Sequence, residues 1–289
     1  MAIKFEQVNF IYFPKTPFEH KALFDINLEF ENGKFYSIIG HTGSGKSTLV
    51  QNINALLLPT SGKVKVNDLE ITNNRKNIDF KKVRKTSGLV FQFPEYQLFE
   101  ETVLKDVMFG PKNFKYTDEE ATLAAKEALS IVGIDESLYT KSPFDLSGGQ
   151  KRRVAIAGIL AMNPEVIILD EPTAGLDPVG SKEIMDIFKT LNEKGKTIIL
   201  ITHDMNIVYE YSQEVVVLNK GEVVYKGDKN SLFEDKEKLL AFYLKEPDLI
   251  RFKSKLAEKG FKIAKEDTYS LENLISNLLR EVKLWKISL

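Results

Sequence analysis

The feature that constrains this chain most is a glycine-rich octapeptide, G-H-T-G-S-G-K-S, at Gly40 to Ser47. It follows the apolar run Phe35–Ile39 and precedes a helical pattern, and it fits the phosphate-binding pattern G-x-x-x-x-G-K-[ST]. Glycine lets the backbone wrap closely around phosphate oxygens, so that successive N–H groups point inward at a helix N-terminus. A strand, such a loop and a helix in this order predict an α/β domain that binds a nucleotide.

The side chains of this loop have separate expected tasks. Lys46 should reach the β- and γ-phosphates, and the Ser47 hydroxyl should ligate Mg²⁺. His41 occupies a variable position of the pattern, so no specific role is assigned to it. We expect nucleotide contacts from the whole loop and the residue after it: Gly40, His41, Thr42, Gly43, Ser44, Gly45, Lys46, Ser47 and Thr48.

Short β-branched runs alternate with helical patterns, which predicts a largely parallel sheet. The clearest predicted strands are Phe35–Ile39, Ser87–Phe91, Val166–Leu169 and Thr197–Thr202, followed by a hairpin of Glu214–Leu218 and Glu222–Lys226. A helix is predicted over Ser181–Glu193. From about residue 93 to 162 helical patterns dominate, including Ala121–Val132 behind a capping box at Thr117–Glu120. We therefore expect a helical subdomain inserted into the α/β core.

Several predicted strands end in polar side chains that suit reactions of a bound nucleotide. Asp170 and Glu171 follow one strand, and because neighbouring side chains on a strand point in different directions, we expect separate roles for them. Asp170 would hold Mg²⁺ through water, and Glu171 would polarise the attacking water as general base. His203 could orient water at the γ-phosphate, and Gln92 could offer its amide oxygen to Mg²⁺ or to the water. The alternatives are acidic residues that cap a strand and a structural histidine.

A second glycine-containing loop, D-L-S-G-G-Q at Asp145 to Gln150, also leads into a helical pattern. Its residues Ser147, Gly148, Gly149 and Gln150 are predicted to face a nucleotide from a helix N-terminus. A loop in the helical subdomain cannot easily fold back onto phosphates held by Gly40–Ser47. Tyr12 follows the first predicted strand and could either stack on adenine or pack in the core.

The chain resembles the nucleotide-binding subunit of ABC transporters over about residues 3–230. The resemblance is carried by five motifs in a fixed order: the phosphate-binding loop, the glutamine, L-S-G-G-Q, D-E-P and the histidine. The resemblance implies a P-loop NTPase with a RecA-like parallel core, an N-terminal antiparallel β part and an inserted helical subdomain. It further implies that Tyr12 stacks on adenine and that Gln92 and His203 are the Q-loop glutamine and switch histidine. Asp177 would lie in the loop between subunits. In the implied head-to-tail dimer, Ser147 and Gly149 close over the partner's ATP.

Finer similarities extend over nearly the whole chain, namely P-F-E-H-K-A-L, V-F-Q-F-P-E-Y-Q-L-F-E-E-T-V, F-G-P-K-N and R-R-V-A-I-A-G-I-L-A-M. They resemble the energy-coupling factor transporter ATPases of the A-prime type, which power uptake of vitamins and transition-metal ions. The resemblance implies Mg²⁺-dependent ATP hydrolysis and a heterodimer with a second ATPase. It also implies a transmembrane coupling subunit and a separate substrate-binding membrane protein. An ordinary ABC importer with a regulatory tail is the alternative.

This resemblance suggests a task for an acidic cluster that follows Gln92. The cluster consists of Glu95, Glu100 and Glu101. In the resembled family such carboxylates line a groove for arginines from the coupling helices of the membrane subunit, and bidentate pairing would suit that contact. The alternative is a solvated helix face.

The last part of the chain, residues 231–289, is rich in charge and reads as helical, so we divide the chain into an ATPase domain over 1–230 and a C-terminal appendage. A final helix from Ser270 carries an apolar stripe typical of a packing face. The stripe consists of Leu271, Leu274, Ile275, Leu278, Leu279, Val282 and Trp285. This helix either docks on its own domain or forms a dimerisation or partner surface.

Composition narrows the functional classes. With 40 basic and 41 acidic residues the formal net charge is -1, so we expect no nucleic-acid partner. The chain has no cysteine, which excludes disulfides and thiol chemistry. We find no signal-peptide pattern and no apolar run near the ~20 residues that span a bilayer. A peripheral position on the cytoplasmic face of the cell membrane, held by partners, is expected.

Overall fold

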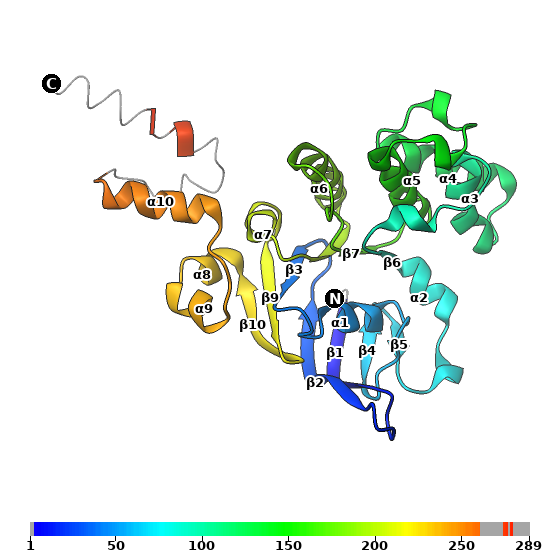
Figure 1. Cartoon of the computed structure of the whole chain (residues 1–289). Coiled ribbons are helices and arrows are strands. Elements are labelled where there is room, and N and C mark those ends of the chain that lie inside the picture. Colours follow the sequence, from blue (N-terminus) through cyan, green and yellow to red (C-terminus); the bar gives the residue numbers. More distant parts are fainter. Residues whose placement is uncertain (1–2, 261–273, 277, 280–289) are drawn as a thin grey trace.

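A six-stranded sheet forms the centre of the computed structural model, which describes residues 3–260, 274–276 and 278–279. Its strand order is β10-β9-β3-β8-β7-β6 (Figure 1). All neighbours pair in parallel except the terminal hairpin of β9 and β10. The strands are β3 (Phe35–Ile39), β6 (Ser87–Val90), β7 (Val166–Asp170), β8 (Thr197–Ile201), β9 (Glu214–Asn219) and β10 (Glu222–Asp228). The predicted parallel core and its hairpin are therefore confirmed, with ends shifted by one or two residues.

A second, antiparallel sheet lies at the N-terminal end of the chain, in the order β2-β1-β4-β5. Its strands are β1 (Ile3–Tyr12), β2 (His20–Phe30), β4 (Ser61–Val66) and β5 (Leu69–Ile71). Phe5 and Phe30 of this sheet are buried in one cluster with Leu49 of α1 (Lys46–Ile53) and Ile38 of β3. The antiparallel sheet thus packs directly on the elements that flank the glycine-rich loop.

Helices fill most of the segment between β6 and β7, as the sequence predicted. They are α3 (Val103–Asn113), α4 (Asp118–Ile131) and α5 (Gly148–Leu160). The capping box is present, because the Glu120 N–H donates to Thr117 Oγ1 and the Thr117 N–H donates to Glu120 Oε2. It starts α4 three residues before the predicted Ala121. Figure 1 shows this helical subdomain standing apart from α1 and the antiparallel sheet.

The remaining helices cover the sheet or follow it. They are α2 (Phe80–Thr86), α6 (Pro178–Glu193), α7 (Met205–Tyr211), α8 (Lys229–Phe233), α9 (Lys236–Ala241) and α10 (Asp248–Glu258). The start of α6 lies at Pro178 rather than at Ser181, because Asp177 caps it. No helix in the described part of the chain is both long and apolar enough to cross a bilayer.

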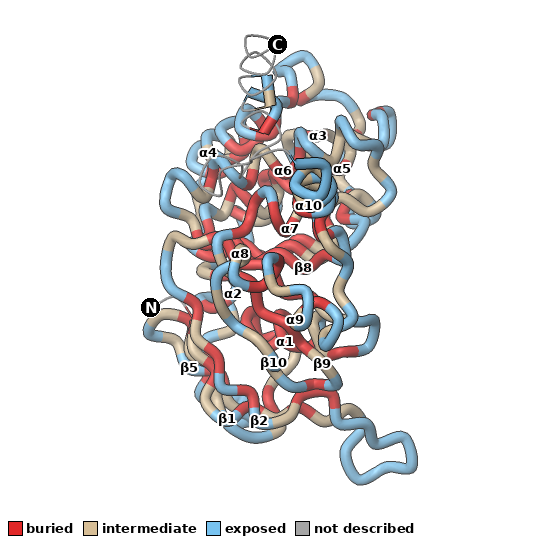
Figure 2. The backbone as a smooth tube through the Cα atoms, turned by 90° about the vertical axis from the view of Figure 1, so that its left-hand side faces the viewer, coloured by how far each residue is buried: buried red, intermediate tan, exposed pale blue. Residues whose placement is uncertain are grey.

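The first C-terminal helices share a core with the central sheet and α7. Leu232, Phe233 and Leu239 are buried together with Val208 of α7 and Val217 of β9. By contrast α10 buries only Ile250, and Figure 2 shows its tube as largely exposed. The proposed division after residue 230 falls inside α8, whose Leu232 and Phe233 are buried in this shared core. Most of the final helix predicted from Ser270, including Leu271, Val282 and Trp285, lies outside the described residues.

Candidate nucleotide-binding site

Parallel pairing collects the sequence-predicted groups at one edge of the central sheet. The loop Gly40–Ser47 follows β3, His203 follows β8, Asp170 and Glu171 end β7, and Gln92 follows β6. These strands are consecutive neighbours, so their carboxyl ends meet at the same edge. Ligands of open α/β sheets bind outside such ends. The structure therefore brings together groups that lie up to about 160 residues apart in sequence.

The glycine-rich loop can be formed only with glycine at two of its positions. Gly40 has a φ of 144°, and a Cβ there would lie 2.1 Å from the Leu218 carbonyl oxygen. Gly45, with a φ of 100°, would place a Cβ 2.7 Å from the Ala22 carbonyl oxygen. The β9–β10 hairpin supports the loop from beneath, since the Gly221 N–H donates to the Ser44 carbonyl oxygen at 3.0 Å.

Two side chains of the loop, Lys46 and Ser44, are placed to bind an anion. Lys46 Nζ donates to the carbonyl oxygens of Gly40 at 2.7 Å and His41 at 2.8 Å, which holds the ammonium group over the loop. Burial lowers the pKa of Lys46, while the charges of Glu171 and Asp170 act in the opposite direction. The Ser44 hydroxyl is buried and has no hydrogen-bond partner among the described residues. Since a buried polar group without a partner is costly, a phosphate oxygen is a fitting ligand for it.

Asp170 is the carboxylate best placed for a hard cation. Burial raises its pKa, the Ser47 hydroxyl lowers it by hydrogen bonding, and Glu171 raises it further. In the described part of the chain no three His, Asp or Glu side chains gather closely enough to hold a metal ion alone. Mg²⁺ commonly takes only one or two protein oxygens and completes its shell with phosphate and water. Asp170 and Ser47 fit that donor set.

Glu171 and His203 form a pair at the mouth of the site. His203 Nδ1 lies 2.8 Å from Glu171 Oε1, and the side chains are 83% and 17% exposed respectively. The Glu171 N–H donates to the Ile201 carbonyl oxygen at 2.9 Å, which continues the ladder one residue beyond β7. Glu171 also has a φ of 51°, a conformation that costs a non-glycine residue free energy and is enriched at functional sites. Its carboxylate is thus held between the buried strands and solvent.

The other predicted contacts to the nucleotide lie around this edge. Tyr12 is the last residue of β1 rather than following it, and its hydroxyl lies 3.0 Å from Thr48 Oγ1. The Tyr12 ring therefore reaches the first turn of α1. Gln92 is exposed, two residues beyond β6.

The Ser-Gly-Gly loop occupies a different part of the molecule. Ser147 caps α5, its Oγ accepting from the Gln150 N–H while Gln150 Oε1 accepts from the Ser147 N–H. Figure 1 places α5 in the helical subdomain, away from α1. A Cβ on Gly148 or Gly149 would meet no described atom within 4 Å. The fold of this chain thus gives no reason for glycine at these two positions. Asp177 caps α6 through the Gly180 N–H at 2.7 Å.

Arg152, which was not among the residues predicted from the sequence, connects three of these segments. The Arg152 side chain is only 3% exposed and pairs with both carboxylate oxygens of Glu95, at 3.0 and 2.7 Å. It also donates to the carbonyl oxygens of Pro172 at 3.2 Å and Ala174 at 2.7 Å. A signal was available, because Arg152 shares its helix face with the buried Ile156 and Leu160.

This pair changes the expectation for the acidic cluster. Glu95 is not free to receive an incoming arginine, because both its oxygens bind Arg152. Arginine lowers the Glu95 pKa against the opposing effect of burial. Glu101 is exposed and pairs with Lys105 at 2.7 Å, one helical turn away. Glu100 and Glu101 are left as the accessible members of the predicted groove.

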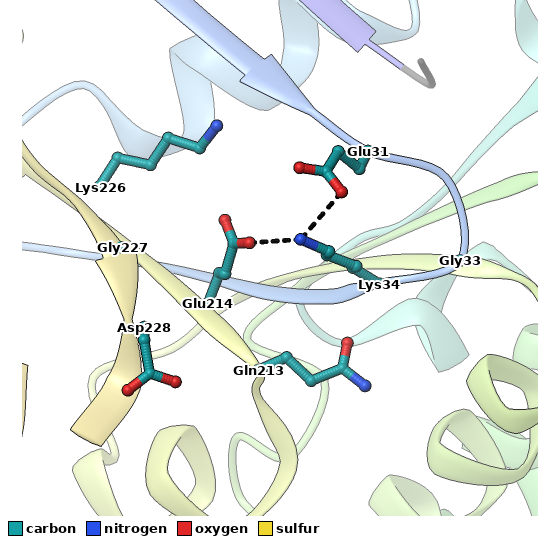
Figure 3. A pocket seen from close by; sticks show the side chains of 8 residues that line it. All are labelled: Glu31, Gly33, Lys34, Gln213, Glu214, Lys226, Gly227 and Asp228. Atoms are coloured by element: carbon teal, nitrogen blue, oxygen red, sulfur yellow. Dashed lines mark hydrogen bonds and ion pairs between the residues drawn. The ribbon is translucent and has the colours of Figure 1, made fainter. Parts of the chain in front are cut away.

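An open hollow of about 620 Å³ lies at the opposite edge of the central sheet (Figure 3). Lys34, just before β3, pairs there with Glu31 at 2.9 Å and Glu214 at 2.6 Å. The remaining lining residues are Gly33, Gln213, Lys226, Gly227 and Asp228. None of the nucleotide-site groups named above lines this hollow, and in its Lys34–Glu214 pair the two side chains are only 34% and 20% exposed.

Comparisons with known proteins agree with this geometry. The sequence model of the family described as ABC transporter matches residues 23–174. The energy-coupling factor transporter ATP-binding protein EcfA2 of Enterococcus faecalis is 50% identical over 284 residues, 98% of each chain. The protein of that name from Streptococcus pneumoniae is 53% identical over 260 residues, 90% of this chain and 93% of the other.

Solved structures show the same similarity. The structure of cbiO1 from Clostridium perfringens, described as part of the ABC transporter complex cbiONQ, gives a TM-score of 0.73 at 40% identity. It covers 89% of this chain and 98% of its own. The dimeric ATP-binding cassette MJ0796 bound to ADP and Pi gives a TM-score of 0.69 at 35% identity and covers 78% of this chain and 98% of its own.

Asp170→Asn should stabilise the fold in metal-free buffer, because it removes a charge that burial disfavours. The folded-state pKa of Asp170 lies above its ordinary value of 3.8, so the folded chain holds this proton more tightly than the unfolded chain. Wild-type stability from this group is therefore lost as the pH rises above 3.8, and the variant should gain its full advantage at neutral pH. Urea unfolding in EDTA measures it, with the exposed Asp68→Asn as control. A less stable Asp170→Asn protein at neutral pH would contradict this account.

Proposed function

The chain belongs to the ABC transporter family, as the ATP-binding, ATP-hydrolysing subunit of an energy-coupling factor transporter of the EcfA2 type, and we propose how its parts divide that work. We propose that it powers uptake of a vitamin or other micronutrient. It acts as one half of a heterodimer with a second ATPase, on the cytoplasmic face of the membrane. A transmembrane coupling subunit and a separate substrate-binding membrane protein complete the assembly.

The residues at the sheet edge have distinct proposed tasks in hydrolysis. The N–H groups of the loop Gly40–Ser47 and the ammonium group of Lys46 hold the phosphates. Tyr12 stacks on adenine. Asp170, Ser47 and Gln92 would hold Mg²⁺, which would supply positive charge beside the phosphates. Glu171 accepts the proton of the attacking water, while His203, 2.8 Å from it, orients that carboxylate and the γ-phosphate.

One observation carries the proposal that the site is completed by another chain. Gly148 and Gly149 stand at the N-terminus of α5 with no described atom near a would-be Cβ, so their lack of side chains serves something outside this subunit. A helix N-terminus that presents N–H groups suits the γ-phosphate of a nucleotide. Closure of two chains head to tail would bring Ser147 and Gly149 against the partner's ATP, with Asp177 near the boundary.

Gly149→Ala should separate folding from turnover. In the first turn of a helix, alanine in place of glycine is expected to raise the free energy of unfolding by up to about 1 kcal/mol. ATP binding to this chain's own loop should be unchanged. Turnover of the assembled transporter should fall by about a hundredfold, because the added Cβ keeps the two halves from closing.

Gly40→Ala is the matched control for that experiment. Its Cβ would collide with the Leu218 carbonyl oxygen at 2.1 Å, so both stability and nucleotide binding should be lost. Normal turnover by Gly149→Ala in the intact complex would count against a composite site. Loss of ATP binding by the isolated Gly149→Ala chain would do the same.

The proposed contact with the membrane coupling subunit lies beside Gln92. Exposed rings gather there on the segment between β6 and α3 and on α3 itself: Phe93, Tyr96, Phe99 and Phe109. Phe99 and Phe109 meet edge to face at 4.8 Å between ring centroids. Glu100 and Glu101 add accessible carboxylates to this surface. Aromatic rings with neighbouring carboxylates suit a partner helix that carries arginine and small apolar residues.

Charge reversal at the accessible carboxylates should break this contact without affecting nucleotide binding. We expect tagged Glu100→Lys/Glu101→Lys protein, extracted from membranes in mild detergent, to lose the membrane subunits while retaining the second ATPase. The wild-type chain should recover both. Glu119→Lys, at an exposed position of α4, is the control and should behave as wild type. Recovery of the membrane subunits by the double variant would reject this surface, and recovery of only a homodimer by the wild type would reject the assembly.

A further inference from the structure

The C-terminal segment contacts the phosphate-binding loop through a pair of aromatic rings. The ring centroids of His41 and Tyr243 lie 5.8 Å apart, with the ring planes inclined at 61°. His41 belongs to the loop, whereas Tyr243 lies about 200 residues later, between α9 and α10. Neither side chain has a task in the proposed hydrolysis.

Tyr243 stands where a helix ending of this type normally has glycine. The Leu244 N–H donates to the Leu239 carbonyl oxygen at 2.8 Å, and the Tyr243 N–H donates to the Leu240 carbonyl oxygen at 3.1 Å. This pattern is a Schellman motif with Tyr243 at the C′ position. Its φ of 54° lies in the left-handed region, which is unfavourable for a bulky residue. The fold alone therefore favours glycine here.

The fold does not use the Tyr243 ring for its core. The side chain is 76% exposed, while its neighbours Phe242 and Leu244 pack against the cluster around α8 and β9. Packing of Phe242 and Leu244 fixes the backbone on the side of this cluster. The Tyr243 side chain between them points away from the cluster. The ring contact with His41 is what this placement achieves.

The same segment is tied to the element that follows His203. Asn206 Nδ2 donates to Asp248 Oδ2 at 2.9 Å, and the Asp248 N–H donates to Asn206 Oδ1 at 2.8 Å. Asn206 lies in the first turn of α7, three residues after His203. We call residues 243–248 the C-terminal strap. The strap contacts the loop that follows β3 and the helix that follows β8. The strands β3 and β8 are neighbours in the central sheet.

Position 41 matters for the shape of the loop. The His41 carbonyl oxygen accepts from Lys46 Nζ at 2.8 Å and from the Ser44 N–H at 3.1 Å. A ring held against the His41 side chain limits movement of that carbonyl, and with it the position of the Lys46 ammonium group. Binding to a loop that is already ordered costs less conformational entropy.

We infer that Tyr243 is a positioning residue for the nucleotide site: through His41 it orders the phosphate-binding loop, so that the C-terminal strap controls ATP affinity. This inference rests on the proposed nucleotide contacts of residues 40–48. It makes the C-terminal helices part of the ATP site of their own subunit, in addition to any contact with another chain.

Tyr243→Gly tests the inference, because stability and binding should move in different directions. Glycine relieves the left-handed backbone, so the thermal midpoint should stay equal or rise. Affinity for a ribose-labelled fluorescent ATP analogue should fall about two- to tenfold, the range expected for one aromatic contact. Tyr243→Phe keeps the ring and should bind as wild type. Leu240→Ala, at a 77% exposed position one turn earlier, is the matched control and should also bind as wild type.

A double-variant cycle identifies the partner ring. His41→Ala should weaken binding by a similar factor, and adding Tyr243→Gly to it should cause no further loss. Unchanged affinity in Tyr243→Gly, weakened affinity in Tyr243→Phe, or fully additive losses in the double variant would each overturn the inference while leaving the ATPase assignment intact. Failure of the wild-type chain to bind the analogue would overturn the nucleotide site itself, and the inference with it.

Discussion

Parallel pairing of β9, β3, β8, β7 and β6 is the constraint on which the rest of the structure depends. Because every strand in this set runs in the same direction, each carboxyl end contributes its next residue to a single edge. This edge brings together the phosphate-binding loop, the histidine, the two carboxylates and the glutamine, although these groups are far apart in the sequence. The antiparallel sheet and the β9–β10 hairpin then support the loop, through Leu49 in the shared core and Gly221 beneath Ser44.

Buried charged residues stabilise the fold, whereas exposed charged residues are available to bind partners. Arg152 and Glu95 are desolvated together, and two backbone carbonyl oxygens accept hydrogen bonds from Nη1 of the same guanidinium group. A pair of this kind is costly to break from one side. It therefore links α5 to the segment after Gln92 and to the segment after Glu171. Glu100 and Glu101, which remain accessible, are the groups available to another subunit.

The sequence alone predicted the parallel core, the helical insertion and the edge of the sheet that carries the site. Those features follow from local patterns, namely apolar runs that end in glycine, carboxylate or histidine. The Arg152–Glu95 pair and the contact of Tyr243 with His41 were not predicted, because each joins segments whose proximity only the fold determines. Glu95 shows the difference most clearly: the family resemblance placed it in an acidic cluster that receives arginines from a partner, but in the fold both its carboxylate oxygens pair with Arg152. The division after residue 230 and the role of the final helix remain proposals.

The central claim is that this chain holds a nucleotide by itself but hydrolyses it only when another ATPase completes the site. The most direct test measures phosphate release per chain as the total concentration of the purified ATPase pair is lowered, alongside nucleotide binding at each step. Binding should persist on dilution, while turnover per chain should fall as the two subunits separate. This chain alone should bind ATP with little turnover. Full turnover per chain at concentrations where it is monomeric would contradict the account.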